Sequence, residues 1–181
     1  MKKIETGIEG LYLLQPRVFE DERGYFFESW NEELFNDLAI PNDFKQDNQS
    51  KSVKGVLRGL HFQCNPHGQA KLVRVITGSV LDVAVDLRKD SPTYGKSYKA
   101  ILSDKNKTML YIPVGFAHGF LTLEDNTVFS YKCSNLYNKE AEGSLRWDDA
   151  DLRIDWELST EPILSDKDAI APLFKDFVSP F

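Results

Sequence analysis

Cysteine and histidine are scarce in this sequence, which has two of the first and three of the second among its 181 residues. Two cysteines, Cys64 and Cys133, are too few for the disulfide framework of a small secreted protein, and they suit a reducing compartment. The charged N-terminus also has no apolar segment of the kind that directs secretion. We therefore expect a cytoplasmic protein whose thiols belong to the core or to the wall of a site.

Positive charge and long apolar runs are lacking as well. The chain has 22 Lys and Arg against 28 Asp and Glu, a formal net charge of -6, which argues against broad binding to nucleic acid or to an anionic membrane. No apolar run is long enough to span a bilayer. The composition is otherwise that of an ordinary globular protein, and the length predicts one domain over residues 1–181.

The scarcity of histidine bears directly on metal binding. His61, His67 and His118 are the only histidines, and Gln63 stands where a His-x-His pair would place its second imidazole. Two imidazoles on one strand face can bind one ion together, which a histidine and an amide do poorly. We therefore expect no metal site.

Short stretches typical of β-strands dominate what is present. They are separated by turn residues, for example at residues 21–24, 103–106 and 124–126, where Asp, Asn and Gly supply turn chemistry. Helical spacing occurs at residues 31–39, and a cap at 166–168 predicts a short helix over 169–173. Many short strands with little helix predict a β-sandwich or barrel. The expected strands are residues 8–15, 25–30, 44–50, 56–63, 71–76, 80–88, 97–102, 108–112, 119–123 and 127–134.

A hairpin is expected where residues 71–76 and 80–88 flank Gly78 and Ser79. Period-two alternation then places Lys71 on the same face as Asp82, with Val73, Val75, Ala84 and Asp86. The opposite face of 80–88 is wholly apolar and needs a packing partner. A lysine on an interior face requires a partner or a chemical role.

Residues 56–63, with the sequence VLRGLHFQ, place a cation and an imidazole in one apolar strand. Strict alternation would send Arg58 and His61 to opposite faces, and both can face one cavity only if the backbone bulges. Gly59 between them would permit such a bulge. A histidine on an apolar strand can also be a satisfied core residue, so its neighbours decide between the two interpretations.

Proton-transfer catalysis needs a base that titrates near neutrality, an orienting carboxylate and a cation where negative charge develops. A barrel could bring together candidates for each role. They are Arg58, His61, Lys71, Asp82, His118, Tyr131 and several acids late in the chain.

With these residues in view, the sequence resembles the dTDP-4-dehydrorhamnose 3,5-epimerase family over residues 15–175. The matching segments are residues 19–28, 46–48, 56–63, 68–74, 82–86, 112–120, 131–132, 142–143 and 164–168. The resemblance implies a mainly β, cupin-like jelly-roll barrel with short flanking helices. It also implies a cofactor-independent isomerase whose substrate is a dTDP-linked 4-keto-6-deoxy sugar.

The resemblance implies a role for each catalytic residue. His61 would remove the acidic proton beside the C4 ketone, and Asp168 would hold His61 in one tautomer. Lys71 would stabilise the enolate, and Tyr131 would donate a proton to the opposite face. Without the resemblance, Tyr131 reads equally well as an aromatic wall residue.

The resemblance also implies a set of substrate-binding residues. Arg23, Arg58 and Lys167 suit the two phosphates. In the family Phe19 and Arg23 come from the neighbouring subunit, which implies a homodimer that exchanges N-terminal strands. The full set is Phe19, Arg23, Phe26, Glu28, Gln46, Asp47, Asn48, Arg58, Gln63, Asp82, His118, Glu142 and Lys167.

Three alternatives stay open at this point. One is an epimerase that inverts C3 alone, because Leu136 replaces a second aromatic found in many relatives and so alters how the sugar is held. Another is a jelly-roll module that binds nucleotides or glycans without catalysis. The third is a metal-dependent cupin oxygenase, which would carry a transition metal after purification.

Overall fold

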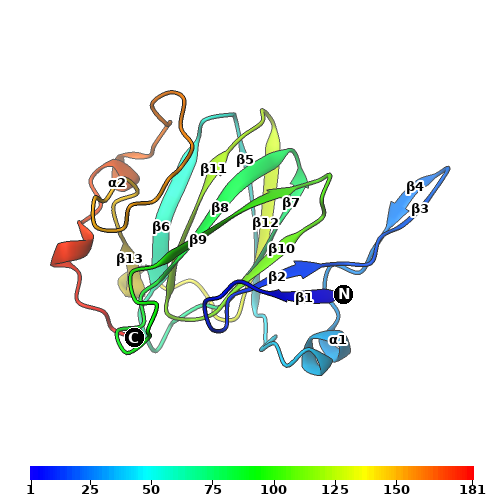
Figure 1. The fold of residues 1–181 in the computed structure, drawn as a ribbon, viewed down its shortest axis with the longest axis horizontal. Helices are drawn as coiled ribbons and strands as arrows, with labels where there is room; N and C mark the ends of the chain where they lie inside the picture. Colours follow the sequence, from blue (N-terminus) through cyan, green and yellow to red (C-terminus); the bar gives the residue numbers. More distant parts are fainter.

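The computed structural model describes residues 1–181 in full, and its centre is a pair of facing antiparallel sheets (Figure 1). The first sheet has six strands, in the order β1 (Lys2–Glu5), β2 (Tyr12–Gln15), β10 (Met109–Ile112), β7 (Lys71–Thr77), β12 (Thr127–Cys133) and β5 (Gln46–Ser52). The second has five strands, in the order β13 (Glu142–Ser144), β6 (Leu57–Gln63), β11 (Phe116–Thr122), β8 (Ser79–Asp86) and β9 (Ser97–Ser103).

Successive strands from β5 to β8 and from β10 to β13 alternate between the two sheets, which is the connectivity of a jelly roll. One apolar core lies between the sheets and draws on both, with Val73 and Phe129 from the first and Val80, Ala84 and Phe120 from the second. The predicted mainly β jelly roll is confirmed.

Helices are short and lie outside the sheets. Helix α1 (Glu32–Asp37) begins where Asn31 accepts a hydrogen bond from the Leu34 backbone, and α2 (Asp166–Ala169) begins at Ser165. The single-turn 3-10 helices are η1 (Lys139–Ala141) and η2 (Phe174–Asp176). None of the helices is long and apolar enough to cross a membrane.

A hairpin of β3 (Phe19–Asp21) and β4 (Gly24–Phe26) projects away from the body, as Figure 1 shows in blue. The turn expected at residues 21–24 closes it. Two aromatic rings near its base receive cations from the body, with Lys107 Nζ 3.7 Å from the Tyr25 ring centroid and the Arg74 guanidinium 5.9 Å from that of Phe27. Every residue of β3 and β4 is exposed.

The hairpin expected between residues 71–76 and 80–88 is wrong. Strand β7 pairs with β10 and β12, whereas β8 pairs with β9 and β11 in the other sheet. Gly78, at φ +82°, turns the chain from one sheet to the other. Strand β8 is buried at every residue because one of its faces packs against the first sheet and the other against the C-terminal segment.

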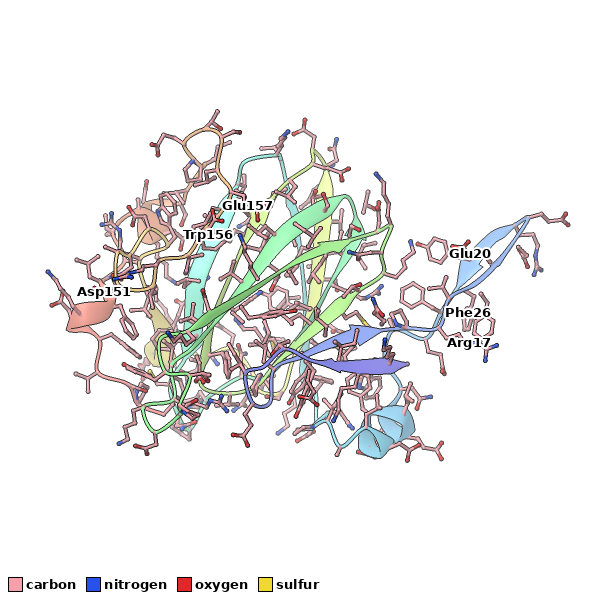
Figure 2. All side chains as sticks on the ribbon, in the orientation of Figure 1. Arg17, Glu20, Phe26, Asp151, Trp156 and Glu157 are labelled. Atoms are coloured by element: carbon pink, nitrogen blue, oxygen red, sulfur yellow. The ribbon has the colours of Figure 1, made fainter.

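The predicted assignment of side chains to the two faces of these strands is nevertheless correct. Lys71 and Asp82 point into the same interior from opposite sheets, close enough for Asp82 to act on the Lys71 charge. The apolar face of β8, including Leu81 and Val83, packs against Trp156 and its neighbours in the C-terminal segment. Figure 2 labels Trp156, and Figure 1 shows the same segment in orange and red beside β6.

Several element boundaries also differ from expectation, among them the start of β11, at Phe116 rather than at residue 119. The first strand, expected at residues 8–15, covers only Tyr12–Gln15 (β2). Strand β1 at Lys2–Glu5 was not predicted, and a turn that contains Gly7 and Gly10 at positive φ joins the two. The aromatic strand ends at Phe26 rather than at residue 30. The C-terminal helix occupies 166–169 rather than 169–173, because Ser165 provides the cap and Asp168 lies inside the helix.

The bulge predicted at Gly59 is present. His118 of β11 faces His61 while Phe120 faces Arg58, so β6 uses one residue more than β11 between these pairs. Gly59 has φ +119°, and a Cβ there would lie 2.6 Å from the Gly119 Cα. Only glycine meets both conditions, and the bulge brings Arg58 and His61 to one side of the strand.

We expect Gly59→Ala to lower the free energy of unfolding by about 3 kcal/mol, since it combines backbone strain with overpacking. Gly55→Ala is the matched control, because Gly55 has φ +85° but nothing within 4 Å of its Cβ position. It should cost only about 1 kcal/mol. Urea unfolding of both variants checks this, and equal losses would show that the close approach to Gly119 is unimportant.

Candidate active site

A histidine on β6 and an aspartate on α2, from distant parts of the chain, meet beside the interior of the barrel. His61 Nε2 lies 2.6 Å from Asp168 Oδ1. The Asp168 side chain is 4% exposed and that of His61 is 32% exposed, so the carboxylate sits behind the ring and the ring reaches the cavity. The two residues therefore form a pair with its imidazole directed at a ligand.

The state of Asp168 fixes the tautomer of His61. Burial raises the pKa of the Asp168 carboxyl, but hydrogen bonds from His61, Ser165 and the Gly59 backbone, with the charge of His61, lower it below its ordinary value. The ionised carboxylate can only accept, so His61 Nε2 carries the proton and donates it. The lone pair on His61 Nδ1 is then free to act as a base.

Lys71 and Tyr131 lie beside each other on β7 and β12. Lys71 Nζ is 6.0 Å from the Tyr131 ring centroid and has no hydrogen-bond or ion-pair partner in the protein. Burial lowers the pKa of Lys71, opposed by Cys133, Asp82 and Glu142. Burial raises the pKa of Tyr131, so its phenol keeps the proton that a general acid needs.

A second histidine and aspartate pair forms the back wall. His118 Nε2 lies 3.0 Å from both carboxylate oxygens of Asp82, and both side chains are buried. Burial lowers the pKa of His118, against the effect of Asp82. His118 faces His61 across the β6–β11 pairing. The neutral imidazole of His118 therefore lies next to the pair formed by His61 and Asp168.

Two hollows meet at these groups. One, of about 430 Å³, is lined by Gln46, Asn48, Gln49, His61, Phe62, Gln63, Gln69, Lys71, Tyr131, Tyr137 and Glu142. The other, of about 230 Å³, is lined by Ser50, Arg58, His61, Lys71, His118, Gly119, Phe120, Tyr131, Ser165 and Asp168. His61, Lys71 and Tyr131 line both, so a ligand that spans the hollows passes these three side chains.

The ends of this site carry charged groups. Arg58 lies at the smaller hollow and donates to Ser52 Oγ. Glu142 lies at the larger one, where Lys167 Nζ is 2.5 Å from its Oε1. Burial raises the pKa of Glu142, but Lys167 and Tyr137 lower it below its ordinary value. Lys167 is therefore held next to the larger hollow by its ion pair with Glu142.

Seven of the expected binding residues are absent from the lining of the two hollows. Two of them, Asp82 and Lys167, lie directly behind the lining, where they contact His118 and Glu142. Phe19, Arg23 and Phe26 are on the projecting hairpin, where Figure 2 shows Phe26 clear of the body. Arg23 pairs there with Asp21. Glu28 accepts from Asn31 beside α1. Asp47 points to the outer face of β5 and pairs with Lys132.

Sequence reasoning missed eight residues that line the hollows, among them Tyr137, Ser165 and Gln69. Tyr137 lines the larger hollow and donates to Glu142 Oε2, at 3.2 Å. Ser165 donates to Asp168 Oδ2 at 2.9 Å, and Gln69 lines the larger hollow. The cap pattern at residues 165–168 could have indicated Ser165, whereas no local pattern distinguishes Tyr137 from a loop residue.

We expect Ser165→Ala to lower kcat about tenfold, because Asp168 loses the hydrogen bond that fixes its second oxygen. The pKa of Asp168 lies below its ordinary value, so its contribution to stability is present above that value and is lost as the pH falls through the folded one. The stability gap between wild type and variant should therefore be widest at neutral pH and narrow in acid.

The control is Ser165→Thr, which keeps the hydroxyl and should restore both kcat and the pH dependence. Urea titrations at neutral and acidic pH, with steady-state kinetics, measure the two effects. An equal stability loss at all pH values would mean that Ser165 only caps α2.

A jelly-roll barrel whose interior holds an oriented histidine, a lysine and a protonated tyrosine defines a cupin-like protein equipped for proton transfer at carbon. The sequence profile of the dTDP-4-dehydrorhamnose 3,5-epimerase family matches residues 5–176. The chain belongs to this family.

Individual relatives agree over nearly the whole chain. The dTDP-4-dehydrorhamnose 3,5-epimerase of Salmonella typhimurium is 52% identical over 171 residues, covering 94% of this chain and 93% of the relative. The crystal structure of the enzyme from Elizabethkingia anophelis superposes with a TM-score of 0.93 at 54% identity, covering 97% of both chains. The family and the isomerase class expected from the sequence are confirmed.

One solved relative contains a sugar nucleotide. It is the dTDP-6-deoxy-D-glucose-3,5-epimerase of Legionella pneumophila in complex with dTDP-4-keto-L-rhamnose, with a TM-score of 0.93 at 46% identity, covering 96% of this chain and 93% of that one.

Proposed function

We propose that the chain converts dTDP-4-dehydro-6-deoxy-D-glucose to dTDP-4-dehydro-L-rhamnose by inverting C3 and C5. The observation that carries this proposal is the placement of His61, Lys71 and Tyr131 around the junction of two hollows, with Asp168 behind His61. Family membership supports the same reaction.

The C4 ketone acidifies the hydrogens on C3 and C5. His61 Nδ1 removes one of them as a proton, and the electron pair moves onto the C4 oxygen as an enolate. The Lys71 ammonium stabilises that charge in surroundings where it is weakly screened. Tyr131 then delivers a proton to the opposite face of the same carbon, and His61 returns a proton to Tyr131 through solvent. Each of these steps uses a side chain of the protein, so we propose that no cofactor takes part.

The remaining contacts would hold the nucleotide. Arg58 and Lys167 suit the two phosphates, and His118 with Asp82 would face the sugar. Polar side chains on β5 and β13 would bind the sugar or the base. We assign substrate binding to Arg58, Lys167, His118, Asp82, Gln46, Asn48 and Glu142. Asp47 and Glu28 lie outside the hollows of this chain and pair with Lys132 and Asn31, so we do not assign them to the substrate.

We also propose that the site is completed by a second copy of the chain, in a homodimer built on the N-terminal strands. The hairpin aromatics Phe19 and Phe26 are 51% and 66% exposed, which supports a partner for them. Phe19, Phe26 and Arg23 would then reach the nucleotide of the neighbouring subunit. Analytical ultracentrifugation checks this, and a monomer at assay concentrations would contradict it.

We place the protein in the cytoplasm. Its two cysteines are unpaired, which supports a reducing compartment.

Solvent deuterium labelling tests the function. The dTDP-linked 4-keto sugar, incubated with the protein in deuterium oxide, should gain deuterium at C3 and at C5, seen as the loss of two proton resonances. Labelling at C3 alone would favour the C3 epimerase. No labelling at either carbon would favour a binding module.

A further inference from the structure

The segment 135–138 borders the larger hollow and carries Tyr137. Residues 135–137 make no backbone–backbone hydrogen bond. Tyr137 nevertheless has a defined place, since its hydroxyl donates to Glu142, which also pairs with Lys167. Something other than regular backbone pairing therefore holds the segment.

Three glutamine side chains hold it, and we name Gln46, Gln63 and Gln69 the glutamine cradle. Each residue from 135 to 138 has one backbone group bound by this cradle. Gln69 Nε2 donates to the Asn135 carbonyl at 2.8 Å, and Gln46 Oε1 accepts from the Tyr137 amide at 2.9 Å.

Gln63 has the central place in the cradle. Its Nε2 donates to the Leu136 carbonyl at 3.3 Å and to the His67 carbonyl at 2.7 Å, and its Oε1 accepts from the Asn138 amide at 2.7 Å. The side chain is 5% exposed. Its two N–H donors and its oxygen are thus engaged within the protein, and little capacity remains for a ligand.

We propose that Gln63 is a positioning residue, which fixes the segment 135–138 so that Tyr137 and Glu142 form one wall of the substrate site. The effect on substrate rests on the proposed function, whereas the effect on the segment does not. His61, Lys71 and Tyr131 stand on β6, β7 and β12, whose strand pairing does not involve residues 135–138. Gln63 should therefore act on binding more than on proton transfer.

The test is Gln63→Met, which keeps the length of the side chain and removes all three hydrogen bonds. KM for the dTDP-linked 4-keto sugar should rise about tenfold, with a much smaller change in kcat, since lost hydrogen bonds loosen the wall but not the base. Amide hydrogen exchange over residues 134–138 should be at least tenfold faster in the ligand-free protein.

Lys51→Met is the control for introducing a methionine, because Lys51 is exposed on β5, lies outside both hollows and should change neither measurement. Gln69→Met removes one cradle bond and should move both in the same direction by less. It also serves if Gln63→Met does not fold.

A double-mutant cycle with Tyr137→Ala separates positioning from direct contact. If Gln63 acts through the segment, Gln63→Met should raise KM little further once Tyr137 is removed. Additive effects on KM, or a raised KM with unchanged hydrogen exchange, would overturn the proposal. Absence of turnover in the wild type would reject the proposed function, and the exchange measurement would still decide the role of Gln63.

Discussion

Replacing His61 with asparagine should lower kcat by about 10³-fold or more, because a general base contributes roughly 10²–10⁴ to a proton-transfer rate. The asparagine amide can still donate to Asp168, so the fold should tolerate the change, but no lone pair of suitable basicity then faces the sugar. Deuterium incorporation at C3 and at C5 should fall together, since His61 is the imidazole that pairs with Asp168 at the junction of the two hollows.

Binding and folding measurements serve as the control for His61→Asn. The affinity for dTDP and the urea midpoint should stay near the wild-type values, because the phosphate-side groups and the sheets are untouched. Turnover within tenfold of wild type would exclude His61 as the base. Loss of dTDP binding in parallel with turnover would instead indicate that the imidazole mainly shapes the site.

Local pattern predicted much of this arrangement because the decisive features are local. The bulge at Gly59 follows from alternation between Arg58 and His61 with a glycine between them, and the shared interior face of Lys71 and Asp82 follows from period two. The bulge needs only the geometry of a single strand, whereas the shared face was predicted from a hairpin that the structure does not contain.

Local sequence patterns could not predict which strands pair in the jelly roll. A tight turn at Gly78 suits a hairpin and a crossing between sheets equally well, and only the burial of β8 on both faces decides between them. The cradle around Tyr137 was hidden for a similar reason, since Gln46, Gln63 and Gln69 lie more than 60 residues from the segment that they hold.

Lys71 has conflicting effects on catalysis and on stability. Its ammonium sits in the site with no hydrogen-bond or ion-pair partner, and burial lowers its pKa from the ordinary 10.5. A charge held this way costs the folded state free energy, yet the same weak screening lets it stabilise an enolate strongly. A neutral residue of similar length should therefore separate the two effects.

Lys71→Met should lower kcat by about 10²–10³-fold, the usual loss when one stabiliser of a developing oxyanion is removed. The same variant should have a free energy of unfolding about 1 kcal/mol higher than that of the wild type, and so a higher urea midpoint, because a buried charge is replaced by an apolar side chain. Lys51→Met, at an exposed position of β5, is the control and should change neither quantity.

The stability difference between the wild type and Lys71→Met should change with pH in a defined direction. The folded pKa of Lys71 lies below its unfolded value, so the unfolded chain binds more protons between the two, and wild-type stability rises with pH across that window. The variant lacks this rise, and its advantage should shrink as the pH approaches the ordinary lysine pKa. A variant that loses both activity and stability would show that Lys71 supports the fold, and a kcat within threefold of wild type would exclude its role at the enolate.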